Sequence, residues 1–269
     1  MKSWVLGSGS NGNAVLLEAD GARVLIDAGF PIRVLTRRLL SVGVHPREVE
    51  AVILTHEHTD HVFGAAAGVR RYGWRLYGSA GTLVSAPRLA DAPRQAIQVG
   101  GVLGLSTMEI TTIPVSHDAA APVAIVATAR RTGIRTGIAY DLGCATEAVR
   151  RGLARLDVMI LESNHDEGML RAGPYPPSVV ERIASRRGHL SNRAAGDLVC
   201  EIAHGGLARV VLAHISQNCN DPVVAGRSMQ TSVRRTGRGS IRVSLTSQDQ
   251  VAGPFGPDAH SGVQLGLGI

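Results

Sequence analysis

Four side chains that can bind metal ions follow one short apolar run of the sequence. His56, His58, Asp60 and His61 come directly after residues 51–55, Ala-Val-Ile-Leu-Thr. Imidazole nitrogens and carboxylate oxygens are suitable ligands for zinc, manganese or iron. The run differs from the helical HExxH zinc motif, because Asp60 stands where that motif has its second histidine. A turn leaving the strand can instead direct His56 and His58 to one ion and the Asp60–His61 pair to a second.

Three further ligand-type residues stand at the ends of other apolar runs. They are His117 after Ile-Pro-Val-Ser, Asp141 after Gly-Ile-Ala-Tyr, and His214 after Val-Val-Leu-Ala. Taken singly, each is equally compatible with an ordinary polar residue at a sheet edge. Together with the first cluster they give seven ligands, enough to hold two divalent ions, and Asp141 is then the natural bridge between the ions.

Strands that end close together must position these residues, and short aliphatic runs separated by glycine-rich turns recur along the chain. They predict strands at residues 3–6, 14–18, 22–27, 51–55, 108–115, 122–129, 134–140, 157–162, 208–213 and 241–245. Amphipathic spacing predicts helices at residues 31–42, 61–72, 145–154, 175–186, 191–204 and 221–235. Ser191 should cap the helix that it begins. Because helices do not alternate regularly with strands, the pattern favours an α+β layered fold over a Rossmann sheet.

Length and composition suit one large domain or two small ones with a substantial core, and the lack of a convincing linker favours one domain. The chain has 269 residues, of which 44% are hydrophobic. We expect the folded domain over residues 1–250 and a loose tail, rich in Gly and Pro, over residues 251–269. No apolar run approaches the roughly 20 residues that span a bilayer, and the first residues lack the core of a signal peptide. A cytoplasmic protein with no membrane partner is therefore expected.

The order of the ligand motifs resembles that of the metallo-β-lactamase superfamily, up to about Leu245. The resemblance implies a four-layer αβ/βα sandwich with a binuclear site at one edge of the sheets. It also implies a ligand set: one ion is bound by His56, His58 and His117, the other by Asp60, His61 and His214, with Asp141 as the bridge. Asp27, within Leu-Ile-Asp-Ala-Gly, would support the ligand loop from behind.

Finer motifs resemble one branch of this superfamily, the YycJ/WalJ-type enzymes. These motifs lie at residues 7–13, 114–119, 161–166, 173–176 and 187–192. The resemblance implies a bacterial, cytosolic DNA exonuclease of the 5′-to-3′ kind, similar in fold to tRNase Z. Two departures stand out, because Cys219 occupies a position where Asn is expected and the residues beyond Leu245 have no recognised counterpart.

A phosphodiester suits the expected charge of this site. Two divalent ions with a bridging hydroxide leave the cluster slightly positive after Asp60 and Asp141 are counted, and the metal-bound hydroxide is the expected nucleophile. Asp60 is placed to orient it. By resemblance to tRNase Z, His189 donates a proton to the leaving oxygen and Glu162 holds it, because a carboxylate beside an imidazole favours its protonated form.

Substrate contacts are expected from a glycine-rich loop and from arginines. Residues 7–13 could offer backbone N–H groups to a phosphate, although a plain tight turn explains the glycines nearly as well. The candidate substrate-binding residues are Ser8, Ser10, Asn11, Asn13, His165 and Tyr175. The net charge is +6, and the aromatic residues are only two Trp, four Tyr and three Phe. Binding of DNA ends through backbone contacts, tolerant of sequence and sensitive to salt, follows from this balance.

Three other functions stay open at this point. The same ions would activate water against a small molecule such as a lactone, a thioester or a cyclic phosphodiester. A tRNase Z-like RNA nuclease would share the motifs, although the sequence contains no recognisable inserted arm that could grip tRNA. A non-catalytic scaffold is the third, and the seven competent ligand positions argue against it.

Overall fold

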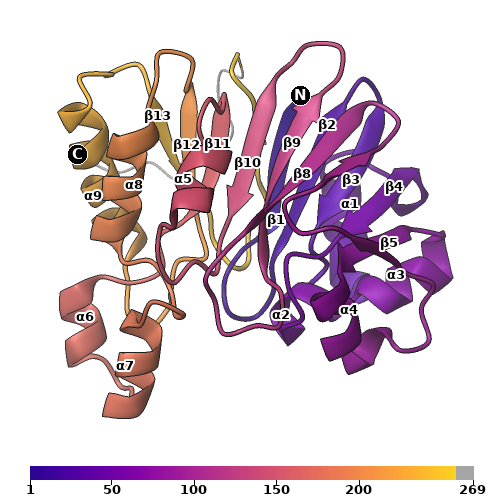
Figure 1. Ribbon diagram of the computed structural model, residues 1–269, viewed down its shortest axis with the longest axis horizontal. Coiled ribbons are helices and arrows are strands. Elements are labelled where there is room, and N and C mark those ends of the chain that lie inside the picture. Colours follow the sequence, from indigo (N-terminus) through magenta and orange to yellow (C-terminus); the bar gives the residue numbers. More distant parts are fainter. Residues whose placement is uncertain (259–269) are drawn as a thin grey trace.

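Two seven-stranded β-sheets form the centre of the protein (Figure 1). The computed structural model describes residues 1–258. The first sheet contains, in spatial order, β14 (Ala252–Phe255), β1 (Lys2–Gly7), β2 (Ala14–Ala19), β3 (Ala22–Ile26), β4 (Val49–Ile53), β5 (Arg75–Ser79) and β6 (Gln95–Ile97). The second contains β13 (Arg242–Leu245), β12 (Arg209–Ala213), β11 (Val158–Glu162), β10 (Arg135–Ala139), β9 (Val123–Ala129), β8 (Met108–Pro114) and β7 (Val102–Gly104).

The main apolar core lies between the two sheets. Val15 and Leu17 of β2 belong to one buried cluster with Ile125 and Ile160 of the second sheet. Leu16, between them in sequence, belongs to a different cluster beneath the helices. Because successive side chains of a strand point to opposite faces, β2 is buried on both faces and reads as a continuous apolar run.

Helices cover the outer faces of both sheets and complete four layers. The first sheet is covered by α1 (Ile32–Ser41), α3 (Ala65–Tyr72) and α4 (Ala80–Ser85). The second is covered by α5 (Glu147–Gly152), α8 (Asn192–Ile202) and α9 (Pro222–Arg235). This arrangement confirms the expected α+β sandwich. No helix within residues 1–258 is long and apolar enough to cross a lipid bilayer.

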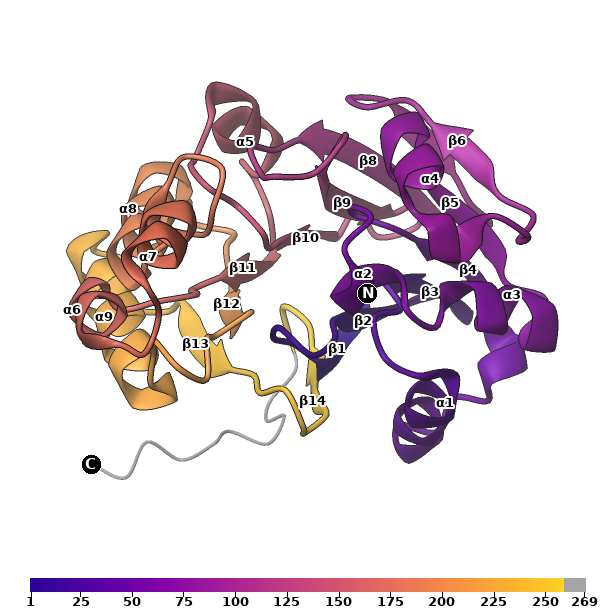
Figure 2. The same ribbon diagram turned by 90° about the horizontal axis from the view of Figure 1, so that it is seen from below.

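The strands that precede the ligand motifs all end at one edge of the sandwich. β3 and β4 are parallel, and so are β10, β11, β12 and β13. β8 runs in the same direction as β10, because both pair antiparallel with β9. Three short helices, α2 (Thr59–Val62), α6 (Glu167–Ala172) and α7 (Pro177–Ala184), lie at this edge (Figure 2).

All ten strands expected from the sequence are present, to within two residues at either end, and four more were missed. β6 and β7 have three residues each, too few to show a period, and β5 ends in Gly-Ser. The short helices α4 and α6 were missed for the same reason. The helix expected over residues 61–72 is wrong in its continuity: α2 and α3 are separate. A Cβ at Gly64 between them would lie 2.3 Å from the carbonyl oxygen of Phe30, which permits only glycine there.

The expected loose tail requires a correction at its start. Residues 252–255 form β14, which pairs antiparallel with β1 and extends the first sheet. The sequence obscured this strand because Gly253-Pro254 normally breaks strands, and Pro is tolerated here at the edge of the sheet. The fold therefore extends beyond residue 250, and residues 259–269 lie outside the described part of the chain.

We expect Ile160→Ala to destabilise the fold strongly. Ile160 has no exposed surface and lies in the core between the sheets. Truncation of such a side chain leaves a cavity and costs about 2–5 kcal/mol of unfolding free energy. Urea denaturation should measure this loss, whereas Val84→Ala, at a side chain that is 83% exposed, should change stability by less than about 0.5 kcal/mol. Equal effects of the two variants would contradict the assigned core.

Candidate metal centre

The expected ligands converge at the edge where the strands of both sheets end. From the first sheet, His56 and His58 follow β4, and Asp60 and His61 lie on α2. From the second sheet, His117, Asp141 and His214 follow β8, β10 and β12. Each sheet therefore contributes one side of the centre.

The ligand atoms form two triads with Asp141 between them. Those of His56, His58 and His117 lie within 4.8 Å of one another, and so do those of Asp60, His61 and His214. Asp141 forms another such group with His56 and His61. Each triad could hold one divalent ion, and this is the grouping that the resemblance to the metallo-β-lactamase superfamily implied.

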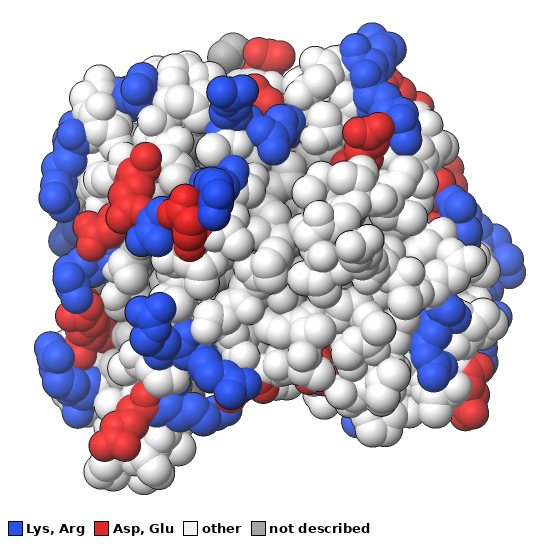
Figure 3. Space-filling view, in the orientation of Figure 1, with Lys and Arg blue, Asp and Glu red and all other residues white. Residues whose placement is uncertain are grey.

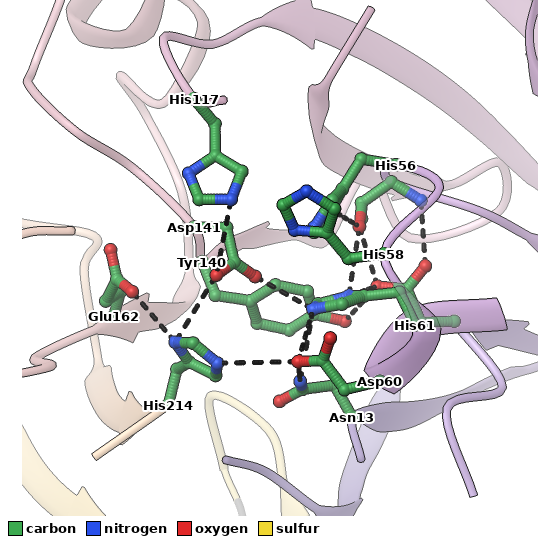
Figure 4. Close-up of polar contacts among 12 residues, drawn as sticks. Asn13, His56, His58, Asp60, His61, His117, Tyr140, Asp141, Glu162 and His214 are labelled. Atoms are coloured by element: carbon green, nitrogen blue, oxygen red, sulfur yellow. Dashed lines mark hydrogen bonds and ion pairs between the residues drawn. The ribbon is translucent and has the colours of Figure 1, made fainter. Parts of the chain in front are cut away.

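Four buried imidazoles are oriented through Nδ1, so that Nε2 faces the centre (Figure 4). The Nδ1 contacts are His61 to Asp27 at 2.7 Å, His214 to Glu162 at 2.9 Å, His117 to the Gly188 carbonyl at 3.0 Å, and His56 to the Thr55 hydroxyl at 3.1 Å. Within the described residues, the buried Nε2 atoms of His56 and His214 have no hydrogen-bond partner, and that of His117 lies 3.1 Å from a carboxylate oxygen of Asp118. Because such atoms are normally satisfied, these residues fit divalent ions, which bind neutral imidazole in this way.

Asp27 lies behind the candidate ligands and contacts one of them, His61, together with Thr55 and Tyr140. Its Oδ2 accepts hydrogen bonds from Thr55 Oγ1 at 2.7 Å and Tyr140 OH at 2.9 Å, besides that from His61. Its Oδ1 accepts from the Thr55 backbone N–H at 2.8 Å. A carboxylate in this position fixes the tautomer and the ring orientation of the histidine in front of it. Sequence reasoning missed Tyr140, which looked like an ordinary strand residue.

An unusual backbone conformation directs three side chains toward the centre. Asp27, Asp141 and His214 have φ angles of 60°, 56° and 50°. This left-handed region is uncommon for residues other than glycine and costs free energy. All three residues stand just after a strand, where the turn redirects the side chain toward the centre. For His214, the backbone N–H donates to Ser8 Oγ at 2.8 Å and helps to hold the turn.

The centre concentrates negative charge in a buried place. Burial by itself lowers the pKa of His61, but Asp60, Asp27 and Asp141 outweigh burial and raise that pKa well above its usual value. Burial would raise the pKa of Asp141, yet His214 and His61 hold it well below its usual range. Ionised carboxylates that recruit protons onto neighbouring imidazoles also favour a divalent cation in place of those protons.

The expected Glu162–His189 contact is present beside the triads. Glu162 Oε1 lies 2.8 Å from His189 Nδ1 and 2.9 Å from His214 Nδ1. Glu162 Oε2 accepts hydrogen bonds from the backbone N–H groups of Leu142 and Leu190 at 2.8 and 3.0 Å. One fully buried carboxylate thus fixes an imidazole of the metal centre and a second imidazole next to it.

The glycine-rich loop supports the centre from within. Ser8 and Asn13 are buried, with 2% and 0% of their surfaces exposed. Asn13 Nδ2 donates to Asp60 Oδ2 at 3.2 Å, and its Oδ1 accepts from Ser8 Oγ at 2.8 Å. Because both side chains are buried, they position Asp60 and do not meet the expectation of substrate contact. Ser10 and Asn11 are exposed and stay candidates for substrate contact.

The remaining expected residues lie around the centre. His165 is buried near His189, and Tyr175, between α6 and α7, accepts a hydrogen bond from Asn218 Nδ2 at 2.9 Å. Asp118 was missed as a site residue. Its carboxylate lies 3.1 Å from His117 Nε2 and 3.0 Å from Arg182, so it links the His117 loop to α7. Its place directly after His117 was the available signal.

Comparisons with known proteins agree with this geometry. Residues 7–135 match the metallo-beta-lactamase superfamily. Together with the four-layer fold, the match shows the metallo-beta-lactamase fold and supports a metal-dependent hydrolase.

Two curated relatives are similar over most of the chain. Exodeoxyribonuclease WalJ of Streptococcus pneumoniae is 27% identical over 91% of this chain and 94% of its own length. Exodeoxyribonuclease YycJ of Bacillus anthracis is 29% identical over 87% of this chain and 90% of its own length. The resemblance to the YycJ/WalJ-type enzymes is thereby confirmed.

Solved structures share the fold at lower identity. YhfI from Bacillus subtilis, a metallo-beta-lactamase fold protein, has a TM-score of 0.71 and 18% identity, covering 93% of this chain and 97% of its own. Zn²⁺-bound PqqB from Methylobacterium extorquens has a TM-score of 0.66 and 19% identity, covering 93% of this chain and 99% of its own. Both alignments support the architecture alone.

We expect Asp27→Asn to weaken metal binding about 10–100-fold, the usual effect of losing a carboxylate behind a histidine ligand. The amide keeps the shape of the side chain but can no longer accept as an anion from His61. Competition between the purified protein and a chelator of known affinity should measure the loss. Asp91→Asn, at an exposed position, is the matched control. Equal affinity of the two variants would remove Asp27 from the centre.

Proposed function

We propose that this hydrolase is a DNA exonuclease that works in the 5′-to-3′ direction with two divalent ions. The observation that carries the proposal is the similarity to two exodeoxyribonucleases over about nine-tenths of the chain. The grouping of potential ligands into two triads joined by Asp141 supports the use of two ions.

In this proposal the seven convergent residues hold the ions, and Asp60 also orients the attacking water. Its Oδ2 is already fixed by Asn13, so the carboxylate has a defined direction. Ions bound there would activate water and neutralise the charge that develops on the phosphoryl oxygens.

His189 is the proposed proton donor to the leaving oxygen. Burial lowers the pKa of its imidazole, but the ionised Glu162 carboxylate outweighs burial and raises that pKa above its ordinary value. With Nδ1 bound to Glu162, Nε2 is the nitrogen left to carry the transferable proton. The side chain keeps 19% of its surface exposed, which gives a substrate access to it.

Exposed arginines near the centre suit a polyanionic strand. On α6 and α7 and directly after them lie Arg171, Arg182, Arg186 and Arg187. Figure 3 shows basic side chains gathered over the region of these two helices. Of the four, Arg182 is held by Asp118, and no ion pair is found for the others within the described chain. Contacts to phosphates from this surface would not depend on base sequence.

We expect His189→Ala to lower the rate of DNA degradation about 10²–10⁴-fold, the usual contribution of a general acid. The metal content of the variant, measured by elemental analysis, should stay near that of the wild type, which separates proton donation from loss of the ions. His45→Ala, at an exposed histidine outside the centre, is the control and should degrade DNA at the wild-type rate. Wild-type activity of His189→Ala would exclude His189 as the acid.

The direction of degradation can be tested with end-labelled DNA. On 5′-labelled strands with Mn²⁺, label should appear at once as mononucleotide, whereas 3′-labelled strands should shorten progressively. Asp60→Ala should abolish both signals, because it removes a proposed ligand and the group that orients water. The opposite order of release would overturn the direction. Hydrolysis of a lactone or thioester without any nuclease activity would overturn the substrate class.

A further inference from the structure

A pocket of about 350 Å³ lies directly beside the candidate metal centre. Its walls come from α6, α7, the start of α8 and the segment that carries His189. His189 itself lines the pocket and also lies 3.3 Å from Asp141 at the centre. A group that leaves on the side of His189 would therefore enter this pocket.

The pocket has an apolar side and a polar side. Leu170, Val180, Ala184 and Ala194 offer surface for a sugar or a base. His165 and Arg171 offer hydrogen-bonding groups. Small-ligand sites combine such surfaces over roughly 300–1,000 Å³. The volume lies at the lower end of that range and is enough for one nucleotide.

His165 has an unused hydrogen-bonding group in this wall. Its side chain is buried, with 3% of the residue exposed, and its Nδ1 has no hydrogen-bond partner within the described residues. Burial lowers the pKa of His165, so the neutral ring offers one donor and one acceptor. A buried polar atom without a partner is costly, and a ligand with polar groups would remove that cost.

Charge at the pocket favours an anion near Arg171. Glu167, the one carboxylate of the lining, is bound to Arg193 at 3.0 Å and to the Ser191 hydroxyl at 3.2 Å. No ion pair within residues 1–258 involves Arg171. Its guanidinium is therefore available for a phosphate, which it can bind with paired N–H groups.

We propose that this pocket binds the terminal nucleotide of the strand, the one that cleavage releases, with its 5′-phosphate on Arg171 and its sugar or base against the apolar side. The inference rests on the proposed function. Water loses a proton to solvent and adds its oxygen to phosphorus, which stays on the remaining strand as a new 5′-phosphate; the bond from phosphorus to the 3′ oxygen breaks, and that oxygen takes a proton from His189. The released nucleoside 5′-monophosphate then occupies the pocket.

Titration calorimetry on the metal-loaded protein tests the pocket directly, with thymidine 5′-monophosphate and thymidine as probes. The monophosphate should bind more tightly than the nucleoside. Arg171→Ala should weaken its binding about tenfold or more, the effect of losing one charged hydrogen bond. Ala184→Trp, which fills the pocket from an exposed position, should weaken binding of both probes. Arg227→Ala, at an exposed arginine of α9, should bind like the wild type.

Degradation of strands with a 5′-phosphate or a 5′-hydroxyl end separates this inference from the proposed function. The wild type should prefer the phosphorylated end, and Arg171→Ala should lose the preference. Nuclease activity with wild-type binding of the monophosphate by both pocket variants would overturn the pocket alone. Pocket-dependent binding without nuclease activity would overturn the proposed function and leave a nucleotide site. If the protein neither bound the monophosphate nor degraded DNA, both the pocket and the proposed function would be overturned.

Discussion

Buried negative charge is the constraint on which the rest of this site depends. Asp27 and Asp141 are buried and Asp60 is partly buried at the edge of the sandwich, and burial of a carboxylate is costly unless positive charge compensates it. Two imidazoles supply partners through Nδ1: that of His61 contacts Asp27 at 2.7 Å, and that of His214 lies 3.5 Å from Asp141. Within residues 1–258, the buried Nε2 atoms of His56 and His214 and one oxygen of Asp141 have no hydrogen-bond partner, and this combination of atoms attracts divalent cations.

The sandwich meets this constraint by using strand ends from both sheets. Apolar strands fill the space between the sheets up to the edge, so the side chains that follow them leave the core at the same level. The left-handed turns at Asp27, Asp141 and His214 concentrate backbone strain there. A well-packed core can sustain that strain, and ligand geometry is then set by rigid elements instead of mobile loops.

Glycines let the supporting segments approach closely enough. A Cβ at Gly29 would lie 1.6 Å from the carbonyl oxygen of Asp60, and one at Gly188 would lie 2.2 Å from the carbonyl oxygens of Arg182 and Ile183. The first contact brings the Asp27 turn against α2. The second packs the segment before His189 against α7 and brings the Gly188 carbonyl to His117. The close approach at Gly29 supports the metal centre, and the one at Gly188 supports both the centre and the neighbouring pocket.

The sequence by itself determined the ligand types, their order and most strands, because apolar runs and the residues that follow them are local features. It missed β14, whose Gly-Pro pair is tolerated only at a sheet edge, and it assigned Ser8 and Asn13 to substrate. Only the tertiary structure decided those cases, since burial, the pairing of Asp27 with Tyr140 and the pocket beside His189 join residues far apart in the chain. No local pattern records which distant groups share a buried space.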